Sequence, residues 1–423
     1  MEKLPLFANW RGWAGFVLLC ALLFGLNLFL KHQHFLALSA DRFTHTQATV
    51  TNQTLKHNQS GTPYWVLRLH SPTHGTFYTT TYERLRPILY REVTLTLITD
   101  QLTFRDYLRG FYAPSFRISL LPDQRPGTYE RILTHITDQH PDPWGGQLFG
   151  ALSLASPIDR QLREEINRFG IAHLVALSGF HLGILTLLIA GVLNPPYRLL
   201  HRRFFPWRNR FFDLGAITFA LLLSYLLFTQ TPPSLLRAFG MFAFGLFLLS
   251  RHIRLLSFVN LLAVVLSLIA LFPGLLFSIG FGLSVAGVFY IFLYLRDFDQ
   301  SIGWKNALLV GLYVFVAMLP IVHFWFPLTS FTQWLSPVLS LLFVPFYPAA
   351  LVLHLIGLGQ WAAWVVMGLF EWRLPVWEVS TPLWFLALYL LASLLAAWQA
   401  KWHKVLLGLM SLWVVWHYGL SAL

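Results

Sequence analysis

The stretch "HLVALSGFHLGIL" (residues 173–185) stands at the head of an apolar run that extends to about residue 193. It places two histidines and a serine where the lipid-spanning part of a helix begins. Polar side chains are costly in a bilayer core, where they hold helices together or line a hydrated path. Because about 18 apolar residues can cross a membrane, the stretch predicts a membrane helix with a polar face.

Similar apolar runs recur along the chain, which has 423 residues, 56% of them hydrophobic and 11% charged. Soluble domains are about half apolar and about a quarter charged. We therefore expect a polytopic α-helical membrane protein with about 9–11 spans. The first span lies within 1–30 and is retained. After 172–193, the other expected spans are 211–229, 235–250, 255–272, 275–295, 306–322, 335–358, 381–398 and 405–421, and 359–376 crosses, re-enters or lies flat.

Residues 31–125 are different in character, with short alternating segments such as "YWVLRLH" and "EVTLTLITD" between turn sequences such as "NQSGTP". Strands at this spacing predict an inserted small β-barrel domain, OB-like in type. Residues 126–170 then predict amphipathic connecting helices at the membrane surface, one of them running from an N-cap at Ser156 to Gly170. Residues 171–423 form the expected membrane domain.

Charge predicts the orientation. The chain carries a net charge of +12, and basic loops tend to stay in the cytoplasm. Placing 197–210, 251–254 and 399–404 inside makes the N-terminus cytoplasmic and the β-domain extracytoplasmic, which in a bacterium means the periplasm or the external face. A polyanionic partner is a second explanation of the same charge. The one cysteine, Cys20, excludes an intrachain disulfide and a cysteine-based metal site.

The polar residues of the opening stretch have several interpretations. On a continuous helix His173, Ser178 and His181 share one face, and small residues, Gly179 among them, gather on the other. Hydrogen bonding between helices is one interpretation of the polar face, and a hydrated path is another. A serine hydrolase needs a third, orienting group that the stretch does not offer. A zinc site needs a third ligand.

Three later motifs also place polar or small residues in apolar surroundings. In "TPPSLLRAFGM", Arg237 lies about one turn inside a span, either snorkelling to the surface or holding an anionic substrate at the outer mouth. "SIGFGLSVAG" interrupts a span with glycines, which indicate close packing or a broken helix. "LPIVHFWFPLTSFTQWLSP" predicts a polar external loop or the start of a re-entrant segment. The residues that we single out in these motifs are Gly280, Gly282, Ser284, His323 and Gln333.

In their order, the four motifs resemble the ComEC family of competence proteins, the inner-membrane channels for DNA uptake in natural transformation. The resemblance covers about residues 150–350, and the β-domain is similar to the OB-like domain of that family. Gly282 stands where the family usually has glutamine. The chain shows no H-x-H-x-D-H cluster of the nuclease domain that many members carry, and no phosphate-binding G-x-x-x-x-G-K-[ST] loop.

The resemblance implies a channel for single-stranded DNA and not an enzyme, with no cofactor or metal. Its expected partners are single-stranded DNA, membrane lipid, a periplasmic DNA receptor, and a cytoplasmic motor or strand-binding proteins. A small-solute or lipid transporter with a periplasmic β-domain is the alternative. The expected path-lining residues are His173, Ser178, Gly179, His181, Arg237, Gly280, Gly282, Ser284, His323 and Gln333.

Overall fold

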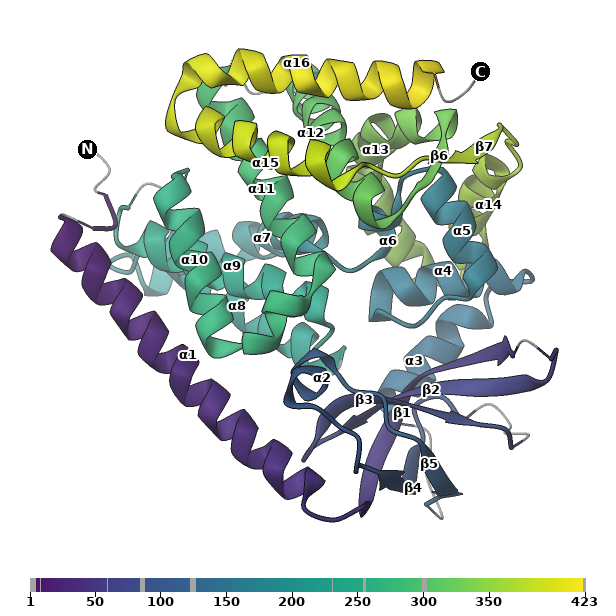
Figure 1. Cartoon of the computed structure of the whole chain (residues 1–423). Helices are drawn as coiled ribbons and strands as arrows, with labels where there is room; N and C mark the ends of the chain where they lie inside the picture. The colour runs from purple at the N-terminus through teal and green to yellow at the C-terminus, as the bar shows by residue number, and fades with distance from the viewer. Residues whose placement is uncertain are drawn as a thin grey trace. The chain divides into compact units, whose positions relative to one another are not determined.

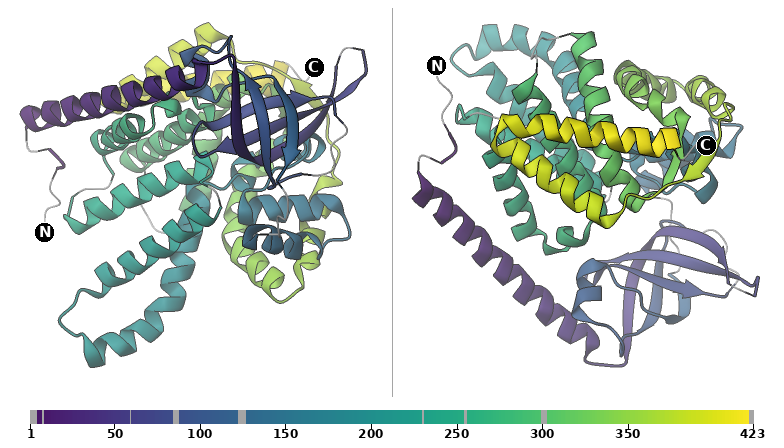
Figure 2. Two further views of the ribbon diagram at one scale, coloured as in Figure 1. Left: turned by 90° about the horizontal axis from the view of Figure 1, so that it is seen from below. Right: turned by 45° about the horizontal axis from the view of Figure 1, so that its top comes forward.

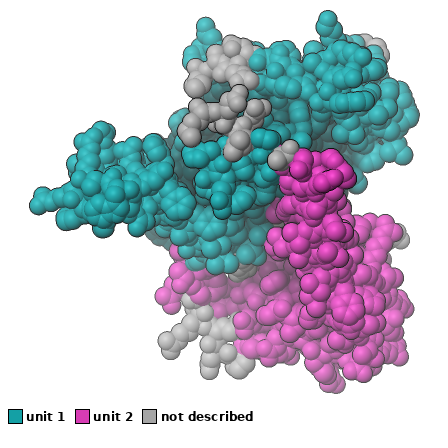
Figure 3. Space-filling model, turned by 90° about the vertical axis from the view of Figure 1, so that its left-hand side faces the viewer, with its two compact units in different colours: residues 1–6, 135–264, 279–423 teal, residues 7–134, 265–278 magenta. Residues whose placement is uncertain are grey.

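A computed structural model describes residues 5–7, 9–58, 60–83, 88–121, 127–229, 231–253, 256–298 and 303–420. The chain forms two compact units, coloured separately in Figure 3. One comprises Met1–Leu6, His135–Val264 and Ile279–Leu423, and the other comprises Phe7–Thr134 and Val265–Ser278. The expected domain boundary at residue 125 lies outside the described residues.

The smaller unit begins with helix α1 (Trp10–Ser39), which the side chain of Asn9 caps by accepting the N–H of Gly12 at 2.9 Å. Of the residues of α1, Cys20 and Leu38 are buried, and the helix is long and apolar enough to cross a membrane. The amide of Asn27 donates to the carbonyl of Ala270 at 2.9 Å. Helix α1 is therefore tied to the segment 265–278, which follows it by more than 200 residues.

The β-domain is one five-stranded antiparallel sheet in the order β3-β2-β1-β4-β5 (Figure 1). The strands are β1 (Phe43–His57), β2 (Pro63–Ser71), β3 (Gly75–Thr81), β4 (Glu92–Ile98) and β5 (Ser115–Leu120). A single parallel bridge, Tyr78 to Tyr112, links β3 to the segment before β5. The predicted sheet is present, but a closed barrel is not formed among the described strands, because β3 and β5 share no ladder.

Alternation along the strands produces the core of this domain. Leu67 and Leu69 of β2 and Val93, Leu95 and Leu97 of β4 are buried at alternate positions. Phe77 of β3 stacks on Phe111 at 5.3 Å between ring centres. Helix α2 (Phe104–Arg109) follows β4, and it contacts η1 (Pro273–Phe277), where the guanidinium of Arg109 lies 4.8 Å from the ring of Phe277. The β-domain and the turn between α10 (Phe258–Leu271) and α11 (Ile279–Asp297) are thus in contact within this unit.

The predicted connecting region forms three helices, α3 (Thr128–Thr137), α4 (Pro143–Leu154) and α5 (Arg160–Arg168). The side chain of Asp159, and not of Ser156, caps α5, because Ala155 ends α4 in a left-handed conformation and places Ser156 in the turn. Helix α4 is buried over most of its length, so the prediction of amphipathic helices is wrong for α4. Gly170 has a φ of +65° and follows the end of α5, as predicted.

The larger unit is built from apolar helices that pack against one another (Figure 2). Across both units, six described helical segments are long and apolar enough to cross a membrane. They are α1, α7 (Gly179–Phe204), α8 (Arg210–Phe228), α11, α12 (Trp304–Trp325) and Phe331–Leu355, which contains α13 (Ser336–Leu355). Four shorter apolar helices are α9 (Pro233–Ser250), α10, α14 (Gly359–Phe370) and α15 (Leu383–Trp398). The sequence predicted about 9–11 spans, whereas six described helices have the length and composition to cross, because the remaining runs form shorter helices.

The end of the chain closes the core of the larger unit. Helix α15 is followed by η3 (Ala400–Trp402), α16 (His403–Val414) and a π-helical turn, η4 (Val415–Leu420). Tyr389 and Trp413 are almost completely buried, and they pack with residues of α11 and α12. Two short strands, β6 (Leu328–Ser330) and β7 (Val376–Glu378), form an antiparallel pair, although α13 and α14 separate them in the sequence. Elements far apart in sequence thus lie together here.

Candidate functional site

Ser178 interrupts the helix predicted for the opening stretch. The chain forms the short helix α6 (Ala172–Val175), leaves the helical conformation, and resumes as α7 with Ser178 as the N-cap. The hydroxyl of Ser178 accepts the N–H of Phe180 at 3.3 Å, and Nδ1 of His181 accepts the N–H of Ser178 at 3.4 Å. The two side chains satisfy backbone donors of the first turn. The prediction of one continuous polar face is therefore wrong.

His181 is buried inside the helix bundle. Its ring meets the rings of Phe343 and Tyr347 edge-on, with centres 5.1 and 4.9 Å apart. Its Nε2 atom has no hydrogen-bond partner among the residues that the structure describes. His173, by contrast, is exposed and donates from Nδ1 to the carbonyl of Gly170 at 3.1 Å, with Nε2 3.0 Å from the hydroxyl of Ser340. The two histidines thus have separate environments.

Gln333 connects the fourth motif to the residues just before the first. It lies in η2 (Phe331–Leu335) and donates from Nε2 to the carbonyls of Leu328 at 2.9 Å and Asn167 at 3.3 Å. Its Oε1 accepts the hydroxyl of Tyr418 at 3.0 Å. A Cβ atom at Gly170 would lie 3.4 Å from the side chain of Gln333, so the left-handed turn and this close approach both favour glycine. Gln333 is 5% exposed and does not lie in an open loop.

Arg237 brings the second and third motifs together. It projects from α9, is 6% exposed, and donates to the hydroxyl of Ser284 on α11 at 3.4 Å. A Cβ atom at Gly280 would lie 3.2 Å from a guanidinium nitrogen, so Gly280 leaves room for the cation. Gly282 is exposed, with no atom within 4 Å of an added Cβ. The side chain of Arg237 is buried between helices in this conformation and does not snorkel to the surface.

The first and second motifs also meet, because Gly179 lies against α9. A Cβ atom at Gly179 would be 3.7 Å from that of Ala238, and Leu182 and Leu235 belong to the same buried cluster. His323 does not lie in the predicted external loop. It is in α12, 2% exposed, and donates from Nδ1 to the carbonyl of Leu319 at 3.0 Å. Three of the four motifs therefore share packed helix surfaces, and the fourth is linked to the first through Gly170.

Comparison with known families identifies the chain. The family model described as "Competence protein" matches residues 152–422, which is more than half of the chain and contains all four motifs. The chain belongs to the Competence protein family. An uncharacterized protein of Aquifex aeolicus (strain VF5) is 26% identical over 215 residues, which cover 50% of this chain and 47% of that protein. The match thus spans about half the length of this relative. No solved structure matches.

In this Competence family member, sequence reasoning missed three polar clusters outside the motifs. Nε2 of His140 lies 3.0 Å from Nε2 of His354, at the ends of α13 and of the α3–α4 loop. Asp297 accepts from His403, whose Nε2 lies 2.9 Å from the hydroxyl of Tyr313. The third cluster consists of Arg168, Glu165 and Arg373, with ion-pair distances of 2.5 Å. A single histidine near a helix end produces no periodic sequence pattern, so the sequence did not indicate the histidine clusters.

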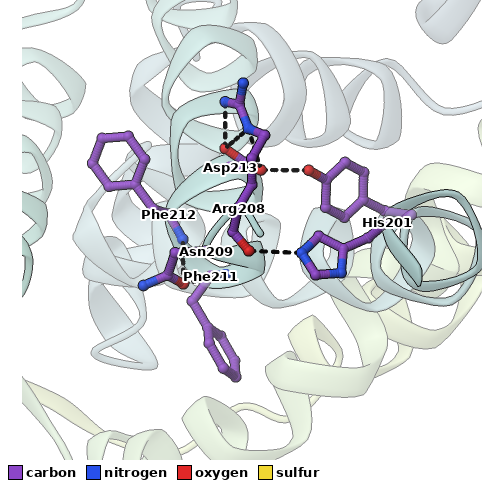
Figure 4. Close-up of polar contacts among 7 residues, drawn as sticks. His201, Arg208, Asn209, Phe211, Phe212 and Asp213 are labelled. Carbon is purple, nitrogen blue, oxygen red and sulfur yellow. Dashed lines mark hydrogen bonds and ion pairs between the residues drawn. The ribbon is translucent and has the colours of Figure 1, made fainter. Parts of the chain in front are cut away.

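A fourth feature was noticed in the sequence only for its charge. The turn between α7 and α8 contains a pocket of about 510 Å³ lined by Arg198, His201, Arg202, Pro206, Arg208, Asn209, Arg210 and Phe211. Figure 4 shows its polar contacts. Within the described ranges, no group of three or more His, Cys, Asp or Glu side chains is arranged to hold a metal ion.

Proposed function

We propose that this chain forms an inner-membrane channel that passes single-stranded DNA into the cytoplasm during natural transformation, with a cytoplasmic N-terminus and a periplasmic β-domain. Membership of the Competence protein family supports a role in DNA uptake, and six apolar helices support a multi-pass membrane protein. A single strand carries about one negative charge per nucleotide, so it cannot cross lipid without a hydrated path lined by protein.

The observation that carries the proposal is the position of Arg237. A cation buried among apolar helices is costly unless it has a polar or anionic partner. Arg237 lies about one turn inside α9, between the helices that carry the first and third motifs, and its guanidinium packs against Gly280. A guanidinium offers a planar fork of donors that suits phosphate oxygens. In this proposal Arg237 contacts the phosphates of the strand when the helices separate.

The β-domain supplies a second surface of suitable chemistry. A pocket of about 420 Å³ is lined by His45, Thr46, Gln47, Thr94, Leu95, Thr96, Arg117 and Ser119. Two exposed rings, Phe43 and Phe116, lie near it with their centres 5.7 Å apart. One cation, several hydroxyl groups and aromatic rings suit weak binding of single strands without sequence preference. We propose that this surface of the β-domain binds single-stranded DNA.

The proposal gives the chain no catalytic step. The hydroxyl of Ser178 lies 3.4 Å from Nδ1 of His181, but the ring of His181 packs against Phe343 and Tyr347. Among the described residues, its other nitrogen has no hydrogen-bond partner. A serine nucleophile needs a histidine that a third group orients. The work of translocation then comes from a cytoplasmic motor or strand-binding proteins, and delivery comes from a periplasmic DNA receptor.

The test is transformation frequency, normalised to the amount of protein in the membrane. Deletion should abolish transformation with normal growth, whereas a growth or envelope defect would indicate a small-solute or lipid transporter. Arg237→Glu should lower the frequency by more than about tenfold, because reversing a buried charge costs several kcal/mol against an anionic ligand. Arg237→Lys should fall in between, since lysine lacks the planar fork.

The matched control is Arg251→Glu, because Arg251 is an exposed arginine at the other end of the same helix. It should transform like the parent. Normal transformation by both Arg237 variants would show that this cation has no part in translocation, and the proposal would lose its main support.

A further inference from the structure

The turn between α7 and α8 concentrates positive charge at the ends of two apolar helices. Residues 197–213 contain five arginines and one acidic residue, Asp213. Both helices are long and apolar enough to cross a membrane, so their shared turn lies at the membrane surface. The arginines of such a turn are usually attributed to orientation alone. The geometry here is more specific than that.

Asp213 is fully engaged by its neighbours, as Figure 4 shows. Arg208 donates to both of its oxygens, with a shortest distance of 2.7 Å, and the hydroxyl of Tyr197 donates to Oδ2 at 2.5 Å. His201 donates from Nε2 to the carbonyl of Arg208 at 2.7 Å. These bonds hold the turn in one shape and neutralise its one acid. Arg208 is thereby paired with the one acid of the turn.

Arg198, Arg202 and Arg210 line the pocket of about 510 Å³ together with His201. In the part of the chain that the structure describes, none of the three arginines forms an ion pair with a carboxylate. Arg198 and Arg202 lie four residues apart on α7, so they project from the same face of the helix. Several guanidinium groups converging on one hollow form a site for an anion with several oxygens.

Phe211 lines the pocket, and two further exposed apolar side chains neighbour the pocket residues in sequence. Trp207 is 78% exposed, Phe211 77% and Leu199 72%. Exposed tryptophan and phenylalanine beside arginine are typical of the boundary between hydrocarbon and headgroups. A ligand of this pocket must therefore carry an anionic group for the arginines and an apolar part that covers the exposed apolar side chains.

We propose that this pocket binds the phosphate of an anionic phospholipid headgroup. The phosphate would lie between Arg198, Arg202 and Arg210, and the acyl chains would pass along Leu199 and Phe211 toward the apolar sides of α7 and α8. A DNA strand also offers phosphate, but it has no acyl chains to cover the exposed apolar groups. The inference depends on the membrane location of α7 and α8 and not on the transported substrate, so it stands or falls separately from the proposed channel.

The test is native mass spectrometry of the full chain in neutral detergent, titrated with phosphatidylglycerol or phosphatidylcholine. Phosphatidylglycerol should bind more tightly than the zwitterionic lipid. Arg202→Gln should weaken phosphatidylglycerol binding about fivefold, which corresponds to about 1 kcal/mol for one arginine near a lipid headgroup. Arg203→Gln is the matched control, since Arg203 is the exposed neighbour with the same charge and does not line the pocket. It should bind phosphatidylglycerol like the parent.

Equal losses in the Arg202 and Arg203 variants would overturn the proposal, because general attraction to the turn would then explain the binding. Equal binding of the two lipids would overturn it as well. Competition with inorganic phosphate and with a single-stranded oligonucleotide separates the remaining sources. If inorganic phosphate displaces the lipid at the same concentration, the site is one for free phosphate. If the oligonucleotide binds more tightly than the lipid and Arg202→Gln removes that binding, the pocket is a DNA site.

Discussion

At the scale of single residues, Gly359 shows how little space surrounds the paired histidines His140 and His354. A Cβ atom added at Gly359 would lie 2.6 Å from the ring of His354 and 2.7 Å from the side chain of Gln139. The ring cannot turn away easily, because Nδ1 of His354 donates to the carbonyl of Ala350 at 2.7 Å. We expect Gly359→Ala to destabilise the protein by about 1–3 kcal/mol, as overpacking does.

The measurement is the thermal midpoint of the detergent-purified protein. Gly368→Ala is the control, because Gly368 lies on the same helix with no atom within 4 Å of an added Cβ. It should be neutral or slightly stabilising, since alanine is the better helix former. Equal midpoints for the two variants would contradict the packing described around His354.

The contact between His140 and His354 predicts a dependence of stability on pH. Nδ1 of His354 must carry the proton that it donates to Ala350, so its Nε2 accepts from Nε2 of His140. Burial, and to a smaller extent His354, lowers the pKa of His140 from 6.5 to about 4, and Asp142 acts in the opposite direction. The nearby His135 contacts the carbonyl of His354 at 3.3 Å.

A lowered pKa in the folded state means that the unfolded chain binds a proton first as the pH falls. The stability contributed by neutral His140 is therefore complete above pH 6.5 and is lost as the pH falls toward 4. We expect His140→Gln to show a smaller loss of thermal midpoint between pH 7.5 and 5 than the parent. His57→Gln, at an exposed strand end, should keep the slope of the parent. A slope that is unchanged in His140→Gln would contradict the prediction.

The sequence singled out the polar residues of the opening stretch, but it did not predict their contacts. The serine and histidine of the opening stretch were recognised, but helical periodicity placed them on one face, whereas Ser178 caps α7 and His181 is buried. Capping is a local property, and the spacing of Ser178 and His181 in S-G-F-H is sufficient to predict it. The contact of Arg237 with Gly280 joins positions more than 40 residues apart. No periodic pattern encodes such a contact.

At the scale of elements, Gln333 of η2 links three other segments, namely β6, the end of α5 and η4. Its amide makes hydrogen bonds to Leu328, Asn167 and Tyr418. Removing it leaves buried polar partners unsatisfied, which costs about 1–3 kcal/mol. We expect Gln333→Ala to lower the thermal midpoint and to expose the segment after Trp413 to proteolysis. Gln360→Ala, at an exposed glutamine, should change neither. Retained protection of the C-terminal segment in Gln333→Ala would contradict this role.

The elements show where sequence reasoning worked and where it failed. Apolar runs predicted most membrane-domain helices, and alternation predicted the strands of the β-domain. Helix α4 was misjudged because its glycines pack closely: a Cβ at Gly145 would lie 3.2 Å from His140, and one at Gly146 3.2 Å from Thr137. The strands β6 and β7 have three residues each, too few for a recognisable pattern. Their pairing depends on the tertiary fold.

At the scale of the whole molecule, the pairing of β6 with β7 limits the path of the chain through the membrane. Leu328 pairs with Glu378 and Ser330 with Val376, so the chain between them makes an even number of crossings. Helix α14 has 12 residues, a length of about 18 Å, which is too short for a hydrocarbon core of about 30 Å. If α14 does not cross, α13 does not cross either, although its length and composition would permit it.

Contacts at both ends of α13 support the same topology. At its start Ser336 donates to the carbonyl of Gly170 at 3.0 Å, and at its end His354 meets His140. Between His140 and Gly170 the chain has only α4 and α5, with 12 and 9 residues, followed by a turn. Neither can cross the membrane. Both ends of α13 therefore lie on the side that His140 and Gly170 share, and 359–376 stays on that side without crossing.

We expect residue 356, beyond the end of α13, to be accessible from the same side as the β-domain. Replacing Cys20, the single cysteine, with serine gives a background for single cysteines at Ile356, Ser60 and Arg203, all exposed. In cells whose outer membrane is permeabilised and whose inner membrane is intact, a membrane-impermeant maleimide should label Ile356→Cys and Ser60→Cys. Arg203→Cys, in the basic turn, should react only after the inner membrane is broken. If Ile356→Cys behaves like Arg203→Cys, then α13 crosses the membrane, and β6 and β7 cannot pair as described unless α14 crosses as well.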